Sequence, residues 1–174
     1  MATKFFTLLA SVLLPIACSG QKTDNTPVRY FNPDLYLGNW YEIARFNHSF
    51  ERGIEYATAR YTMTDKGTVK VVNSGIKEGK KKTSIGKAKF TKTPGILRVS
   101  FFGPFYSDYR VLMVTSDYRY ALVGSKSSNY LWILSRTPKV PEYILSSILA
   151  EARSRGYDTG KLIWVRQSNG TTLF

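Results

Sequence analysis

The sequence predicts an all-β domain, an antiparallel up-and-down meander of short strands with one α-helix near the C-terminus. Three observations predict it: β-rich segments recur at roughly ten-residue spacing, turn sequences such as TDKG and KEGKK separate them, and no helical period intervenes. The segments are ATARYTM, TVKVVNSGI, TSIGKAKF, ILRVSFF, RVLMV, YRYALVGS and YLWILSR. Such strands close either into a barrel or into a sandwich, and their spacing is compatible with both.

The first 17 residues are predicted to be a secretory signal peptide, because Lys4 is followed by an uncharged run that is too short for a stable transmembrane helix. Cys18, the only cysteine, comes directly after this run and cannot form an internal disulfide. Its position resembles the lipobox of bacterial lipoproteins, although Pro15 stands where Leu is usual. We therefore expect Cys18 to be acylated, with simple secretion as the alternative.

The folded domain is expected to span residues 31–166. A chain of 174 residues, 43% hydrophobic, can build the core of one domain. The polar, turn-rich sequence of residues 18–30 predicts a flexible linker after the cysteine. Residues 167–174, QSNGTTLF, are expected to form a loose tail.

Strand parity separates an apolar lining from a charged exterior. In TSIGKAKF, Lys87 and Lys89 share one face, and Phe90 with three small residues forms the other. The same parity turns these residues inward: Tyr61, Asn73, Leu97, Val99 and Tyr109. An eight-stranded barrel with this lining would be partly hollow and could hold one small ligand, whereas a sandwich would use the same rings as solid core.

The stretch GNWYEIARF, residues 38–46, does not separate into a polar and an apolar face. Strict alternation places Trp40, Glu42, Ala44 and Phe46 on one side and Tyr41, Ile43 and Arg45 on the other. Because both sides mix charge with aromatic surface, we expect neither to be buried completely.

One helix is predicted in TPKVPEYILSSILAEARSRGYD, with Pro141 in its first turn and Gly156 as its stop signal. Its apolar stripe consists of Ile144, Leu145, Ile148, Leu149 and Ala152. We expect this stripe to pack on the outside of the barrel, and a membrane-binding helix is the alternative.

Charge is concentrated in residues 66–92, where nine lysines accompany one acid, Glu78, in a chain of net charge +13. This segment could be a solvated hairpin edge, or it could bind anionic lipid or polysaccharide. Nucleic acid is disfavoured because the chain is expected to be exported and its aromatic residues fall mainly outside this segment.

Catalytic and metal-binding patterns are weak. His48 is the only histidine, so histidine-based metal clusters and familiar triads lack parts. EGKKKTS lacks the spacing of a phosphate-binding loop. We expect no catalytic residue, metal or cofactor, and a metal-independent isomerase or hydrolase using an interior Tyr or Glu is the enzymatic alternative.

Several strings resemble the lipocalin family, most closely its bacterial outer-membrane lipoproteins. Gly38-Asn39-Trp40 resembles the family's G-x-W motif, and LWILSRTP resembles the segment that supplies its arginine. LGNWYEIARF, SFERG, VSFFGPFY and YALV match in the same order, over residues 32–165. The resemblance implies an eight-stranded antiparallel up-and-down lipocalin β-barrel with one C-terminal α-helix packed outside.

The resemblance also implies site residues. Gly38, Trp40 and Arg136 would form the closed floor of the barrel, with the arginine across the indole face. The ligand-binding residues carried over from the family are Tyr61, Asn73, Tyr109, Trp132 and Leu134, for each of which plain core packing is the alternative. The implied function is storage or transport of a small lipophilic ligand, a fatty acid or a lysophospholipid, by a protein lipid-anchored to the outer membrane of the bacterial cell envelope. The sequence departs from the family's Thr-Asp-Tyr turn, because its acid comes one place late, at Asp117.

Overall fold

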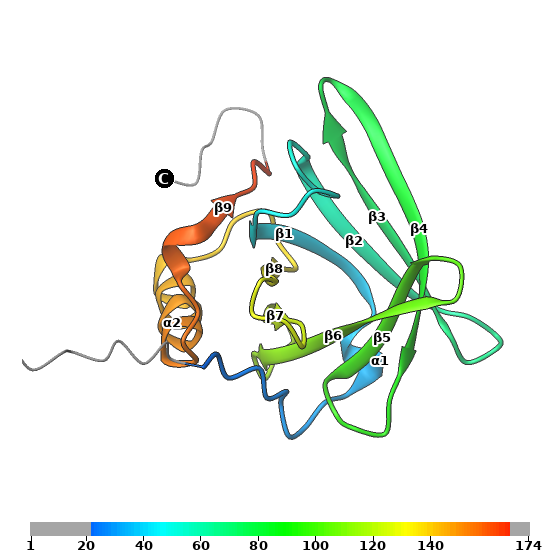
Figure 1. Ribbon diagram of the computed structural model, residues 1–174, viewed down its shortest axis with the longest axis horizontal. Coiled ribbons are helices and arrows are strands. Elements are labelled where there is room, and N and C mark those ends of the chain that lie inside the picture. The colour runs from blue at the N-terminus through cyan, green and yellow to red at the C-terminus, as the bar shows by residue number, and fades with distance from the viewer. Residues whose placement is uncertain (1–21, 168–174) are drawn as a thin grey trace, which may run out of the picture.

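The computed structural model describes residues 22–167, so the predicted signal peptide and Cys18 lie outside the described residues. Eight antiparallel strands follow one another around a closed ring, in which the first strand pairs with both the second and the eighth (Figure 1). They are β1 Gly38–Phe46, β2 Glu55–Met63, β3 Val69–Lys77, β4 Lys80–Phe90, β5 Ile96–Phe102, β6 Phe105–Val114, β7 Tyr120–Gly124 and β8 Leu131–Ser135. The predicted barrel is confirmed, and the sandwich is excluded.

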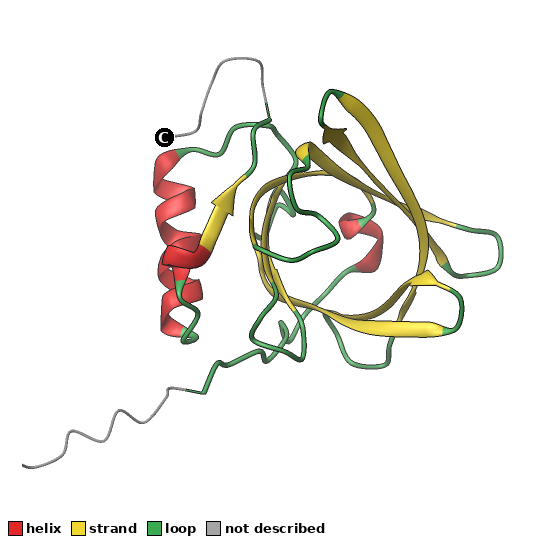
Figure 2. Cartoon of the chain, turned by 45° about the horizontal axis from the view of Figure 1, so that its top comes forward, coloured by secondary structure: helices red, strands yellow, loops and turns green. Residues whose placement is uncertain are grey.

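The two ends of the barrel differ. Because the strands alternate in direction, the connections after β1, β3, β5 and β7 lie at one end, which we call the mouth. The opposite end, the floor, is crossed by the short helix α1, Pro33–Tyr36 (Figure 2). The side chain of Asn32 caps α1 by accepting a hydrogen bond from the Asp34 amide, 2.9 Å away.

A β-bulge in β1 changes the predicted faces of GNWYEIARF. In the pairing of β1 with β8, Glu42 lies opposite Leu134 but Ala44 lies opposite Ile133, so Ile43 is an extra residue. Beyond the bulge the parity is inverted, and Arg45 joins the inward face of Trp40 and Glu42. The expectation that neither predicted face is buried completely was wrong, because Trp40, Glu42, Ala44 and Phe46 are all buried.

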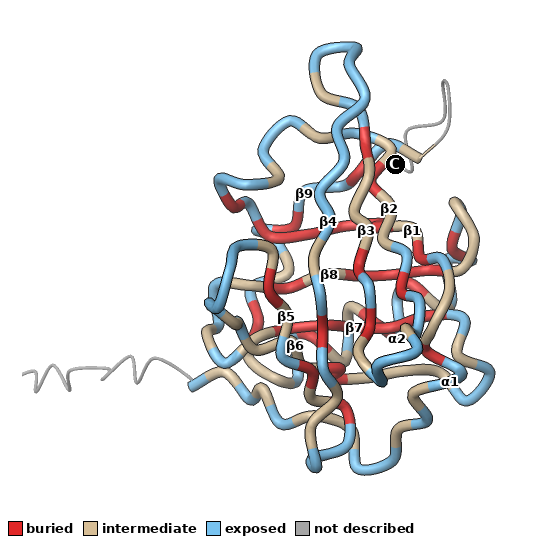
Figure 3. The backbone as a smooth tube through the Cα atoms, turned by 90° about the vertical axis from the view of Figure 1, so that its right-hand side faces the viewer, coloured by how far each residue is buried: buried red, intermediate tan, exposed pale blue. Residues whose placement is uncertain are grey.

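The outward face of β1 is covered by the predicted helix, α2, Glu142–Ser154. Its buried residues Leu145, Ile148 and Ala152 pack with Ile43, Phe46 and residues of β7 and β8 in one core cluster. A second cluster fills the barrel interior. Figure 3 shows these buried segments, with the mostly exposed β3–β4 turn projecting from one end. The predicted position of the helix stripe is therefore confirmed.

Two short elements that the sequence analysis did not predict complete the chain. They are the 3-10 helix η1, Thr159–Lys161, and strand β9, Leu162–Trp164, which pairs with the second half of β1. Beyond β9, the Gln167 side chain donates hydrogen bonds to the carbonyls of Glu42 and Ala57, at 2.6 and 2.8 Å. This residue, expected in the loose tail, bridges β1 and β2 where their pairing ends.

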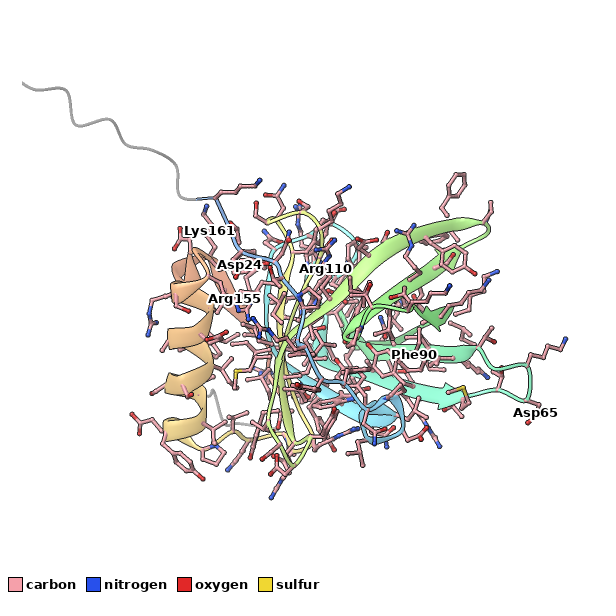
Figure 4. All side chains as sticks on the ribbon, turned by 90° about the horizontal axis from the view of Figure 1, so that it is seen from below. Asp24, Asp65, Phe90, Arg110, Arg155 and Lys161 are labelled. Atoms are coloured by element: carbon pink, nitrogen blue, oxygen red, sulfur yellow. The ribbon has the colours of Figure 1, made fainter. Side chains whose placement is uncertain are left out.

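The described part of the predicted linker, residues 22–30, lies against the domain. The amide of Asp24 donates to the carbonyl of Arg155, and the amide of Val28 donates to the carbonyl of Val111. Figure 4 shows Asp24 between Arg155 and Arg110. The composition of this segment predicts flexibility, and the partners of its backbone groups, in β6 and at the residue that follows α2, are provided only by the tertiary arrangement.

Candidate functional site

The floor of the barrel is built around Trp40 and Arg136. The guanidinium carbon of Arg136 lies 3.8 Å from the centroid of the indole ring, and Trp40 is fully buried. The indole Nε1 donates to the carbonyl of Tyr36 at 2.9 Å, which fixes α1 against the ring. A guanidinium over an indole contributes about 0.5–2 kcal/mol, and Arg136 is partly buried.

Gly38 and the β6–β7 turn complete this floor. Gly38 has a φ of +95°, a conformation that L side chains rarely adopt, and an added Cβ would lie 3.4 Å from Nη1 of Arg136. Arg136 Nε donates to the carbonyl of Tyr118 at 3.2 Å. The displaced acid, Asp117, accepts hydrogen bonds from the Thr115 hydroxyl and the Arg119 amide. The departure from the family turn thus leaves the turn closed and joined to the floor.

Three tyrosines form a hydrogen-bonded layer above the floor. The hydroxyl of Tyr109 lies 2.6 Å from that of Tyr36 and 3.2 Å from that of Tyr61. Burial raises the pKa of Tyr61 to about 12 and raises the pKa of the other two phenols well above their ordinary value. All three are therefore neutral, and their hydroxyls are committed mainly to one another.

Asn73 has a buried oxygen without a partner. It lies on β3 with the parity of Val71, which belongs to the interior cluster. Its Oδ1 accepts no hydrogen bond from the described residues, although the atom is shielded from solvent. An unpaired buried acceptor costs about 1–3 kcal/mol, so a donor entering the interior would be stabilised here.

A charged cluster lies between the interior and the loop that follows β1. Arg45 Nη1 donates to Glu42 Oε1 at 2.5 Å, and Arg45 Nη2 donates to the carbonyls of Glu51 and Ile54 at 2.7 and 3.0 Å. Trp132 Nε1 donates to the Glu51 carboxylate at 3.1 Å. Arg45 therefore fastens the 47–54 loop across part of the mouth.

His48 stands in this loop among aromatic rings. Its imidazole stacks on Phe50 at 4.4 Å between centroids and also contacts Tyr130 and Trp132. Its Nδ1 lies 3.2 Å from Glu51 Oε2, but neither ring nitrogen makes a hydrogen bond with the described residues. Burial, with the nearby Arg45 charge, lowers the pKa of His48 to about 4, so the ring is neutral at neutral pH.

The two carboxyl groups of the cluster are pushed toward their neutral forms. Burial and, next, the charge of Glu51 raise the pKa of Glu42 to about 8, against the opposing charge of Arg45. Burial also raises the pKa of Glu51, while the Trp132 hydrogen bond and Arg45 act in the other direction. The buried guanidinium of Arg45 thus favours the charged form of both Glu42 and Glu51, but ionising both carboxyl groups at once is costly because their charges repel each other.

The structure brings the predicted ligand-binding residues to one inner face. Tyr61, Tyr109, Trp132 and Leu134 belong to the interior cluster, and Asn73 alternates with Val71 beside them. Their contact with a ligand stays a prediction. The sequence analysis missed these interior and mouth residues: Tyr36, Glu42, Arg45 and Glu51. The sequence did signal two of them, because GNWYEIARF contains the charged residues Glu42 and Arg45. Strict alternation places these two on opposite sides of the strand, whereas the bulge at Ile43 brings both to the inner side.

The outer surface carries a separate groove of about 590 Å³ between α2 and β6. Val28, Leu112 and Glu151 contribute to its walls, and the barrel wall separates it from the interior. Among residues 22–167, no group of three His, Cys, Asp or Glu side chains could hold a metal ion. None of the helices in this part of the chain is long and apolar enough to cross a membrane.

Comparisons with known proteins agree with this geometry. The chain is 45% identical over 163 residues to the outer membrane lipoprotein Blc of Escherichia coli K12, covering 90% of this chain and 92% of that protein. It is 31% identical over 160 residues to mouse apolipoprotein D, covering 85% and 84%. The predicted location, the bacterial outer membrane, agrees with the name of the first relative.

A solved structure and a family description complete the comparison. Insecticyanin from the tobacco hornworm Manduca sexta superposes with a TM-score of 0.72 at 24% identity, covering 86% of this chain and 88% of that chain. The family description "Lipocalin-like domain" matches residues 32–167. The closed eight-stranded barrel, its Trp40–Arg136 floor and the matched residues therefore agree, and the chain belongs to the lipocalin family.

Proposed function

We propose that the barrel binds one fatty acid or lysophospholipid and stores or transports it in the cell envelope. The observation that carries the proposal is the unpartnered Oδ1 of Asn73 on an inner face that is otherwise apolar and aromatic. Aromatic and aliphatic walls suit an acyl chain, and the Asn73 oxygen suits one donor near its polar end. The hydroxyl of a lysophospholipid or of a protonated fatty acid supplies that donor.

The proposed binding involves no chemistry. The interior hydroxyls of Tyr36, Tyr61 and Tyr109 are neutral and bonded to one another, so they are poor bases and poor nucleophiles. Glu42 is engaged by Arg45. These contacts favour a binding protein over the metal-independent enzyme considered from the sequence.

We also propose that Cys18 is acylated and holds the barrel at the outer membrane. The cysteine directly follows an apolar run typical of a signal peptide, and a relative with 45% identity is named an outer membrane lipoprotein. Acyl chains contribute about 0.8 kcal/mol per buried methylene, so more than one chain is needed for stable attachment.

Tryptophan emission tests the ligand proposal. The chain from residue 19 onward, prepared without detergent and shown to be folded by circular dichroism, is titrated with oleate and with lysophosphatidylcholine. We expect a saturable change at one ligand per barrel that is lost in Trp132→Ala. Trp164→Ala, which removes a tryptophan from β9, is the control and should retain the change. A folded chain that gives no saturable response to either lipid would contradict the proposal.

A further inference from the structure

We propose that one face beside the mouth of the barrel docks on an anionic lipid bilayer. The docking face consists of the β5–β6 turn, with Phe102 and Phe105, and the outward side of β4, with Ile85, Lys87 and Lys89. This inference goes beyond the binding of a ligand in the interior and does not depend on it. The opposite side of the barrel is covered by α2 (Figure 1).

The apolar part of the docking face is unusually exposed. Phe102 and Phe105 pair across their turn and are 80% and 78% exposed, and Ile85 is 62% exposed. Isolated apolar residues at a surface are common, but two adjacent phenylalanines on a projecting turn are costly to hydrate. Moving such a side chain from water into an apolar phase is favourable. Phe50, 61% exposed, lies in the 47–54 loop at the same end.

The lysines belong to the same surface as the phenylalanines. The ammonium groups of Lys87 and Lys89 lie 5.7 and 5.5 Å from the ring centroid of Tyr106, the residue after Phe105. Lys87 pairs with Ser100 in the β4–β5 ladder. Continuing this register by two residues brings Ile85 beside Phe102. Basic and apolar groups therefore form one continuous face.

The charge of this face is largely uncompensated. Beyond Ile85, the outward side of β4 continues to the exposed Lys81, and the exposed Lys80 and Lys82 flank it with the opposite parity. Asp108, which pairs with Arg98 across β5 and β6, is already engaged by Arg98 and Arg110, and Glu78 lies in the β3–β4 turn. Each basic residue near a negatively charged bilayer strengthens the attraction to it. An anionic bilayer offers headgroups to the lysines and an apolar phase to the phenylalanines, whereas a polysaccharide offers only the first.

Quenching by lipids brominated on their acyl chains tests the docking directly. The full-length protein is reconstituted into vesicles of phosphatidylcholine, with and without phosphatidylglycerol. The Phe102→Trp variant reports from the docking face. Tyr143→Trp on α2 is the matched control, because Tyr143 is 75% exposed and both variants share the same N-terminus. We expect the added Phe102→Trp emission to be quenched in the anionic vesicles and that of Tyr143→Trp to remain unquenched.

A second set of variants tests the contribution of charge. Replacing Lys81, Lys87 and Lys89 with Gln in the Phe102→Trp background should abolish the quenching. Equal quenching of the two tryptophan variants, or equal quenching in both vesicle types, would overturn the proposal. Lysine-dependent binding of dextran sulfate without any quenching would overturn it in favour of a polysaccharide partner. Because no fatty acid is added, failure here is distinct from failure of ligand uptake.

Discussion

The guanidinium of Arg136 lies 3.8 Å from the centroid of the Trp40 indole and also donates to three backbone carbonyls. These carbonyls belong to Leu35, Asn39 and Tyr118, at 2.7, 2.7 and 3.2 Å. They lie at the end of α1, in β1 and in the β6–β7 turn, so one side chain joins three segments that are far apart in the sequence. The floor of the barrel therefore depends on the planar, multidonor shape of arginine.

Arg136→Lys is expected to destabilise the protein by about 2–4 kcal/mol, because an ammonium cannot cover the indole and reach all three carbonyls. Urea unfolding followed by tryptophan emission measures this loss. Arg153→Lys, at an exposed position of α2, is the control and should change stability by less than about 0.5 kcal/mol. Equal stability of the two variants would show that the arginine geometry is unimportant.

Glu42→Gln is expected to weaken the dependence of stability on pH. Burial raises the pKa of Glu42 from 4.5 to about 8, so the folded protein retains a proton that the unfolded chain releases. The resulting stability is fully present below about pH 4.5 and is lost as the pH rises through 8. Glu42→Gln removes this loss, which urea unfolding at several pH values within the window would detect. Glu55→Gln, at an exposed carboxylate of β2, should keep the wild-type slope.

His48 is expected to titrate near pH 4 rather than near its ordinary value of 6.5. Its lowered pKa has the opposite consequence to that of Glu42: the stability is present above pH 6.5 and is lost as the pH falls through 4. Because His48 is the only histidine in the chain, its ring protons give an unambiguous NMR titration. A midpoint near 6.5 would mean that the ring is hydrated and that the 47–54 loop does not bury it.

Asn73→Leu is expected to separate ligand binding from packing. Removing an unpartnered buried oxygen should leave the stability unchanged or raise it by about 1 kcal/mol, while it weakens lysophosphatidylcholine binding by roughly tenfold. Urea unfolding and tryptophan titration measure the two effects. Ser74→Leu, on the adjacent outward position of β3, should leave binding unchanged. If Asn73→Leu lowers stability and leaves affinity intact, Asn73 is a packing residue.

The strands, the turns between them, and the helix with its apolar stripe were predictable from the sequence alone. These features follow from local periodicity and turn chemistry, which act within a few residues. ILRVSFF matches β5 from end to end, and Gly156 adopts the positive φ expected where α2 stops. The Trp40–Arg136 pair was predictable only through resemblance to a family, because 96 positions separate the two residues and no local pattern connects them.

Which groups meet inside the barrel depends on the closed fold and could not be predicted from local sequence. The bulge at Ile43, which turns Arg45 inward, exists because β1 pairs with β8, and alternation within β1 cannot reveal it. The attachment of residues 24–28 likewise depends on partners in β6 and α2. Backbone hydrogen bonds and buried charges are satisfied by whatever the fold brings near, so these positions required the closed barrel to be known.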